Sequence, residues 1–121
     1  MTHRKPTVIN VKASKLRQRG IDDFAKWAAR PNSIYIGRNM SYYVRGAEQS
    51  KWHNPFKISE SRSREESLAA YENYVRSTPE LYDNLYELAG KELGCWCKNK
   101  TAEYVCHGDV LVKLFEEKYA T

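Results

Sequence analysis

Short apolar runs and longer stretches with helical spacing alternate along this chain. The apolar runs at 7–12, 33–37 and 93–97 predict three strands. Apolar residues that recur every three or four positions predict helices at 23–29, 63–76, 79–90 and 108–119. Residues 39–57 follow neither period and predict a long ordered loop, with a short β-ribbon at 41–44.

Capping and helix-breaking residues set the expected helix boundaries. Asp22 is the expected N-cap of the first helix, and Ser63 with Glu66 predicts a capping box at the start of the second. Pro79 suits the first turn of the third helix, and Gly90 suits its end. One face of the last helix is expected to point inward: Val110, Leu111, Leu114 and Phe115.

This alternation predicts an α/β fold, in the form of a small three-layer Rossmann-like domain with a short, mainly parallel sheet. A single domain is expected to span residues 1–121, with a basic arm at about 1–6 before the first strand. In parallel sheets, ligands bind outside the carboxyl ends of the strands. The second strand leads into Gly37 and Arg38 and the third into Cys97, so both following segments are expected at one edge.

The net charge of +5 belongs to the N-terminal region. Residues 1–20 hold six basic side chains and no acidic one, whereas the rest of the chain sums to −1. Such an arm could follow the phosphates of a nucleic acid or could be a solvated edge. No apolar run reaches the ~20 residues of a membrane span, and no apolar secretory segment follows the N-terminus. The three cysteines show no evident disulfide pairing. Together, these features favour a cytoplasmic protein.

The three cysteines suggest a metal site. Cys95, Cys97 and Cys106 could join His107 in a Cys₃His zinc site, although the C-x-C spacing differs from the usual C-x₂-C. The alternative is that the thiols are buried as small apolar side chains. A nucleophilic Cys106 next to a helix start is a third interpretation.

The start of the last helix offers a second kind of site. Its free backbone amides, with Gly108 permitting close approach, could bind a phosphate. Asp109 could cap the helix, bind a ribose hydroxyl or act as a general base. His107 and Asp109 are therefore the candidate catalytic residues.

The segment 51–56 combines a cation, two aromatic rings and an amide. Trp52 or Phe56 could stack on a base, and Asn54 could bind a base edge. Lys51 together with Arg38 could hold phosphate. The alternative is that the aromatic side chains anchor the loop to the core.

Four blocks of the sequence resemble the domain-of-unknown-function 4326 family: Tyr-Ile-Gly-Arg at 35–38, Lys-Trp-His-Asn-Pro-Phe at 51–56, Gly-Cys-Trp-Cys at 94–97 and Cys-His-Gly-Asp-Val-Leu at 106–111. They occur in the family's order. The resemblance implies a protein of bacterial or phage type and indicates which positions form the site. It implies no activity.

We therefore expect a nucleotide-type or nucleic-acid-derived ligand at the carboxyl edge, with hydrolysis or transfer left open. One alternative is a non-enzymatic phage or host protein that sequesters a signalling nucleotide or blocks a partner protein. Another is a zinc-stabilised nucleic-acid-binding module. No membrane association is expected. The expected ligand-binding residues are Gly37, Arg38, Lys51, Trp52, Asn54, Phe56 and Gly108.

Overall fold

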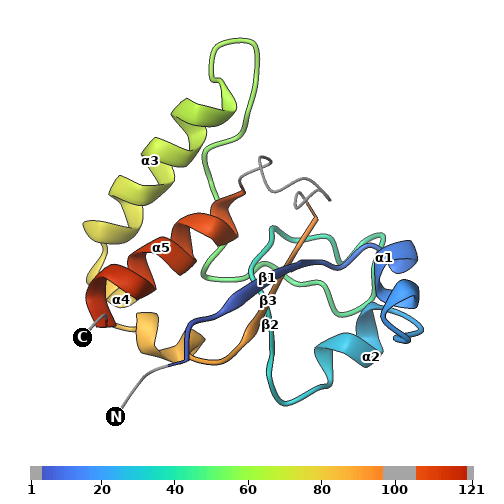
Figure 1. Ribbon diagram of the computed structural model, residues 1–121. Helices are drawn as coiled ribbons and strands as arrows, with labels where there is room; N and C mark the ends of the chain where they lie inside the picture. The colour runs from blue at the N-terminus through green and yellow to red at the C-terminus, as the bar shows by residue number, and fades with distance from the viewer. Residues whose placement is uncertain (1–3, 97–105, 120–121) are drawn as a thin grey trace.

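A computed structural model describes residues 4–96 and 106–119, as helices and strands around a small open sheet (Figure 1). The sheet has three strands in the order β1-β3-β2, and both strand pairs are parallel. Leu93 in the central strand lies between Val8 and Ile34 of its two neighbours. The predicted strands and their parallel direction are confirmed. The strand bounds are β1 Thr7–Asn10, β2 Ser33–Tyr35 and β3 Glu92–Cys95.

Alternate residues of the strands contribute to two separate core clusters. Val8, Ile34 and Leu93 pack with four helical elements, and Ile9 and Tyr35 pack with two others. Figure 1 shows α3 beside α5, with α1 and α2 at the other end of the view. The first group is α3 Arg64–Arg76, α4 Pro79–Tyr82, the 3₁₀ helix η1 Leu85–Leu88 and α5 His107–Tyr119; the second is α1 Ala13–Gln18 and α2 Phe24–Ala28.

Local hydrogen bonds explain where the helices begin. The capping box at α3 is confirmed, because the Ser63 side chain accepts from the Glu66 amide and the Glu66 side chain accepts from the Ser63 amide. The predicted N-cap of α2 was wrong by one residue. The side chain of Asp23 accepts from the Lys26 amide, and Asp22 instead forms an ion pair with the Lys26 ammonium at 2.7 Å.

Three local predictions differ from the structure. Helix α1 was missed, because Leu16 is its one buried residue and no apolar stripe marks it. The ribbon expected at 41–44 is instead a series of turns, in which the Met40 carbonyl accepts from the amides of Tyr43 and Val44. The helix expected at 79–90 is divided into α4 and η1, and between them the side-chain amide of Asn84 donates to the Glu80 carbonyl, a local bond typical of turns.

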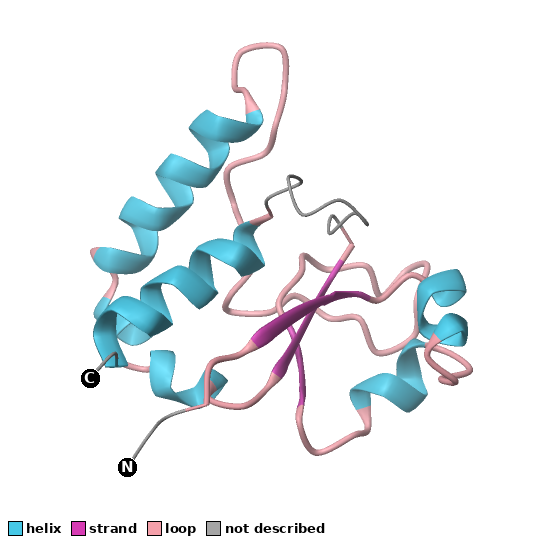
Figure 2. Cartoon of the chain, viewed as in Figure 1, coloured by secondary structure: helices cyan, strands magenta, loops and turns pink. Residues whose placement is uncertain are grey.

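A long loop joins β2 to α3 and contains no named helix or strand (Figure 2). It turns back on itself at an isolated bridge between Ser59 and Arg62. None of the described helices is long and apolar enough to cross a membrane.

The central strand is covered closely by an aromatic ring. Trp27 is fully buried and lies against Gly94, where a side-chain Cβ would come within 2.6 Å of Val11 and would clash with the indole. Glycine is therefore needed at position 94 to let α2 approach the sheet. The Trp27 indole nitrogen donates to the Glu92 carboxylate at 3.1 Å, which fixes the ring over the strand.

Candidate functional site

A pocket of about 390 Å³ lies where β2 and β3 end. We call it the carboxyl-edge pocket. It brings together residues after both strands, part of the long loop, the first residue of α5 and one residue of α3. Its lining residues are Gly37, Arg38, Asn54, Phe56, Lys57, Ile58, Ser67, Trp96 and His107.

The Tyr35 side chain joins the two strand ends beside this pocket. Its hydroxyl donates to the Arg38 carbonyl at 2.5 Å and accepts from the Trp96 indole nitrogen at 2.6 Å. The ring passes over Gly37, where a Cβ would clash with it. Burial raises the pKa of Tyr35, so the phenol stays protonated and able to donate. Gly37 and Trp96 are thereby held as one wall of the pocket.

Two cations lie at the pocket, Arg38 and Lys57, and both are exposed. Neither has an ion-pair partner among residues 4–96 and 106–119, and the residues that line the pocket include no carboxylate. Lys51, which was expected here, instead forms an ion pair with Glu87 at 2.8 Å and does not line the pocket. The pocket therefore carries positive charge that the described protein does not neutralise.

His107 forms a buried, neutral part of the wall. Its Nε2 lies 2.7 Å from the Ile36 carbonyl oxygen, and its ring meets Tyr71 edge-on with centroids 5.2 Å apart. Burial lowers the pKa of His107, more than the bond to Ile36 raises it. Because a carbonyl oxygen can only accept, the proton is assigned to Nε2, and Nδ1 keeps its lone pair.

The segment 51–56 is bound tightly to α3. Trp52 is 2% exposed, so it is a core residue and has no open face for stacking. Its carbonyl accepts from the buried Tyr71 hydroxyl at 2.6 Å. The Asn54 amide donates to Ser67 at 3.0 Å and accepts from the Phe56 amide at 2.9 Å, so both of its ends are already bonded. Of the two aromatic residues expected to stack, Phe56 reaches the pocket.

The start of α5 is packed rather than open. One Asp109 oxygen accepts from the Cys106 amide at 2.9 Å, which stabilises the first helical turn. A Cβ at Gly108 would meet Val8 at 2.9 Å and Ile36 at 3.0 Å, so this glycine lets the helix approach the sheet. Neither Gly108 nor Asp109 lines the carboxyl-edge pocket.

The structure brings two of the three thiols together. The sulfur atoms of Cys95 and Cys106 lie 3.4 Å apart, and both residues are buried. Cys97 lies outside the described residues. Within the described part of the chain, no group of three or more His, Cys, Asp or Glu side chains is arranged to hold a metal.

Sequence reasoning missed four of the pocket residues: Lys57, Ile58, Ser67 and Trp96. Trp96 had a usable signal, because in the strand predicted at 93–97 it alternates with the cysteines at 95 and 97, which places it on the opposite face from them. Ser67 had no such signal in the sequence, because its position at the pocket depends on how α3 packs on the long loop. The hydroxyl of Ser67 donates to the Phe56 carbonyl, and this hydrogen bond joins α3 to the long loop.

The sequence matches known proteins over most of its length. The profile of a family described as "Domain of unknown function (DUF4326)" matches residues 21–117. An uncharacterized protein of Acanthamoeba polyphaga mimivirus is 38% identical over 92 residues, which cover 71% of this chain and 70% of that protein. No solved structure matches. The matched region includes every residue of the carboxyl-edge pocket.

Proposed function

Because this chain belongs to the DUF4326 family, whose description assigns no activity, we propose a function from the carboxyl-edge pocket: it binds a nucleotide-type or nucleic-acid-derived ligand. The observation that carries the proposal is the pairing of two cations, Arg38 and Lys57, with aromatic and apolar side chains in one pocket, whose lining among residues 4–96 and 106–119 includes no carboxylate. A ligand that suits such a lining has an anionic group and a flat apolar group. Nucleotides have both.

The size and position of the pocket support this proposal. A volume of about 390 Å³ lies within the range of roughly 300–1,000 Å³ that small-molecule sites occupy. Ligands of parallel sheets settle outside the carboxyl ends of the strands, where this pocket lies. The expected Rossmann-like architecture places helices on both faces of the sheet. We include it in the same proposal, because helices on the two faces leave the carboxyl edge of the strands open to ligands.

The side chains suggest how the ligand would be oriented. Arg38 can hold a phosphate with two parallel hydrogen bonds, and Lys57 adds a second positive charge. Phe56 and Trp96 line the pocket, and the ring surface that Arg62 leaves open on Phe56 and Phe24 leaves open on Trp96 is available to a base. The Nδ1 lone pair of His107 can accept one hydrogen bond from a base amino group or a ribose hydroxyl.

Binding is the function we propose, and no bond-breaking step is assigned. Of the two residues expected to act in catalysis, His107 lines the pocket and Asp109 caps α5 beside it. A general base must lie within hydrogen-bonding distance of the proton that it removes. Of these two residues, His107 is therefore the one placed to contact a ligand in the pocket.

The test combines mass spectrometry with NMR. Native mass spectrometry would first detect any ligand that copurifies with the protein. ¹⁵N-labelled protein would then be titrated with adenosine and guanosine mono-, di- and triphosphates. We expect the Gly37 amide and the Trp96 indole signals to shift. Arg38→Gln should weaken binding by roughly fivefold, the loss of about 1 kcal/mol expected for one exposed charge contact.

Arg17→Gln is the matched control, since it removes an exposed arginine on α1 that does not line the pocket. Absence of shifts at millimolar nucleotide would contradict the proposal. So would equal weakening by both variants, because it would indicate a general charge effect.

A further inference from the structure

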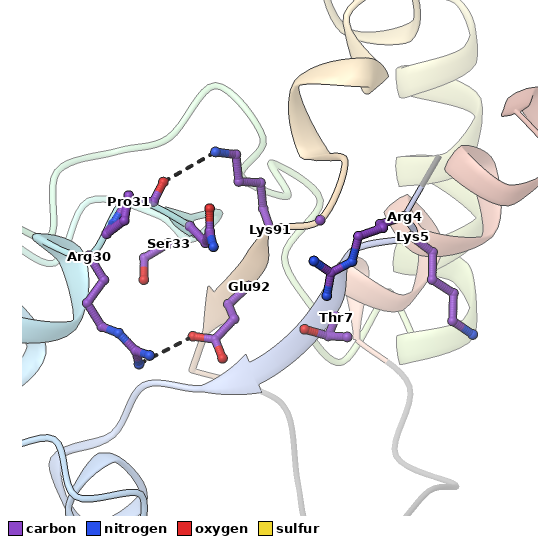
Figure 3. A pocket seen from close by; sticks show the side chains of 10 residues that line it. Arg4, Lys5, Thr7, Arg30, Pro31, Ser33, Lys91 and Glu92 are labelled. Atoms are coloured by element: carbon purple, nitrogen blue, oxygen red, sulfur yellow. Dashed lines mark hydrogen bonds and ion pairs between the residues drawn. The ribbon is translucent and has the colours of Figure 1, made fainter. Parts of the chain in front are cut away.

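A second pocket, of about 310 Å³, lies at the opposite edge of the sheet, where the strands begin (Figure 3). We call it the amino-edge pocket. The segments that lead into all three strands line it. Its lining residues are Arg4, Lys5, Thr7, Arg30, Pro31, Asn32, Ser33, Gly90, Lys91 and Glu92.

Backbone hydrogen bonds hold these segments in place. The Gly90 amide donates to the Arg4 carbonyl at 2.8 Å, and the Thr7 amide donates to the Lys91 carbonyl at 2.9 Å. On the other side of the pocket, the Glu92 amide donates to the Asn32 carbonyl at 2.7 Å. The basic residues of the pocket therefore extend from ordered backbone and do not belong to a loose arm.

The lining contains four cations and one carboxylate, Glu92. That carboxylate accepts from the Trp27 indole at 3.1 Å and lies 3.4 Å from Arg19 and 3.8 Å from Arg30. Its charge is thus shared between two arginines. Arg4 and Lys91 therefore have no carboxylate partner among the described residues.

The remaining cations differ in their freedom to bind a ligand. The Lys91 ammonium donates to the Pro31 carbonyl at 3.2 Å, a neutral partner that leaves its charge in place. Lys5 points away from the other cations in Figure 3 and lies 3.7 Å from Glu116. Arg4 and Lys91 therefore carry the uncompensated charge of the pocket, Arg30 shares Glu92 with Arg19, and the hydroxyls of Thr7 and Ser33 also line the pocket.

We propose that the amino-edge pocket is a second binding site, for the phosphate group of an anionic ligand. Arg4 can present a pair of parallel N–H donors to phosphate oxygens, and Lys91 adds a point charge. Arg30 has further N–H donors besides the nitrogen that faces Glu92. Hydroxyl side chains supply further donors. Clustered like charge disfavours folding unless an anion offsets it, which is a physical reason to expect an occupant.

This site is separate from the carboxyl-edge pocket. The strands between the two edges have three or four residues, so the edges are roughly 10–13 Å apart along the strands. A free phosphate or a mononucleotide would occupy one pocket at a time. A nucleic acid strand could place different phosphates at both.

The test uses two probes on ¹⁵N-labelled protein, inorganic phosphate and a single-stranded oligonucleotide. We expect the amide signals of Thr7, Ser33 and Gly90 to shift, because they line the amino-edge pocket. Signals from Gly37 and Trp96 report the carboxyl-edge pocket in the same spectra, so failure at one site is distinguishable from failure at the other.

The double variant Arg4→Gln/Lys91→Gln should abolish the shifts at the amino edge. It should also reduce the slope of log K against log salt for the oligonucleotide by about 1.4, at ~0.7 for each lost phosphate contact. The control is Lys12→Gln/Arg17→Gln, which removes the same charge from exposed positions outside both pockets.

The two probes also identify the source of the phosphate. Shifts with inorganic phosphate alone would support a small anion, and shifts with the oligonucleotide and a reduced slope would support a nucleic acid backbone. Unchanged amide signals at the amino edge with both probes would overturn the proposal. Equal effects of the test and control variants would overturn it as well.

Discussion

The Nε2 atom of His107 lies 2.7 Å from the Ile36 carbonyl oxygen, so the first residue of α5 is bonded to the residue that follows β2. His107 lines the carboxyl-edge pocket, and the bond requires a hydrogen on Nε2, which is present both in the neutral Nε2–H tautomer and in the charged imidazolium. Because burial disfavours the charged ring, the stability of the junction depends on pH.

The free energy of unfolding should fall as pH falls below about 6.5. The unfolded chain takes up a proton at His107 near pH 6.5, whereas burial holds the native pKa lower, so the unfolded state binds more protons in that interval. Urea denaturation at pH values from about 7.5 to 5 would measure this loss. His107→Gln should flatten it.

Glu72 contributes outside that interval. The pKa of Glu72 is lowered, first by its hydrogen bond from Lys113, so its contribution is lost only as pH falls below about 4.5. A native pKa of His107 at or above 6.5, measured by NMR, would contradict the prediction.

Tyr71→Phe should destabilise the protein by about 1–3 kcal/mol. The variant removes the donor to the Trp52 carbonyl and leaves that buried oxygen unsatisfied. Thermal denaturation would measure the change. Tyr42→Phe is the control, since Tyr42 is 91% exposed and its substitution should change stability by less than about 0.5 kcal/mol. Equal effects would show that the Tyr71 hydroxyl contributes no net stability.

Gly94→Ala should be more destabilising than Gly108→Ala. A Cβ at position 94 would clash with Trp27 and lie 2.6 Å from Val11, whereas one at position 108 would meet the nearest side chains at 2.9–3.1 Å. Overpacking of this kind costs about 1–3 kcal/mol. Chemical denaturation of both variants gives the order, and the reverse order would contradict the packing described for Trp27.

Lys57→Gln should weaken binding of an anionic ligand at the carboxyl-edge pocket by up to about fivefold, whereas Lys51→Gln should leave it unchanged. Lys57 lines the pocket, whereas Lys51 lies outside it and forms an ion pair with Glu87. Titration with the nucleotides named above measures both affinities. Stronger weakening by Lys51→Gln would favour the site expected from the sequence.

Cys95 and Cys106 should react slowly with iodoacetamide in the native protein and quickly after denaturation, because both thiols are buried. Peptide mapping by mass spectrometry would follow each cysteine separately. A zinc site would add a distinct signature, since a chelator would then increase the native rate of alkylation. The same experiment therefore tests the metal site that the cysteine spacing suggests.

The sequence predicted well what depends on local pattern. The three strands, the capping box of α3 and the inward face of α5 follow from apolar spacing and capping chemistry, and the structure confirms them. Helix α1 has a single buried residue, Leu16, and gave no periodic signal. Leu16 packs in one cluster with Phe24 and Trp27 of α2, a contact between separate segments that no local pattern shows.

The sequence predicted that the segments after β2 and β3 would meet at one edge of the sheet, and the carboxyl-edge pocket lies there, but the residues that line it were predicted less well. Arg38, Phe56 and His107 line the pocket as expected. Trp52 and Lys51 do not, because α3 packs on the long loop and turns Trp52 into the core. Which face of an irregular loop is buried depends on tertiary contacts, and sequence spacing carries no period to reveal it.

The central position of β3 determines the order in which the sheet can form. Thr7 and Ser33 both pair with Glu92, so the first two strands share one partner that follows them along the chain. During synthesis, β1 and β2 leave the ribosome without that partner, whereas α2 and α3 can already form. The native ladder closes only after β3 emerges, and it requires contacts between residues far apart in sequence, which makes this step slow. A nascent chain that stops before residue 92 therefore has no native strand pair.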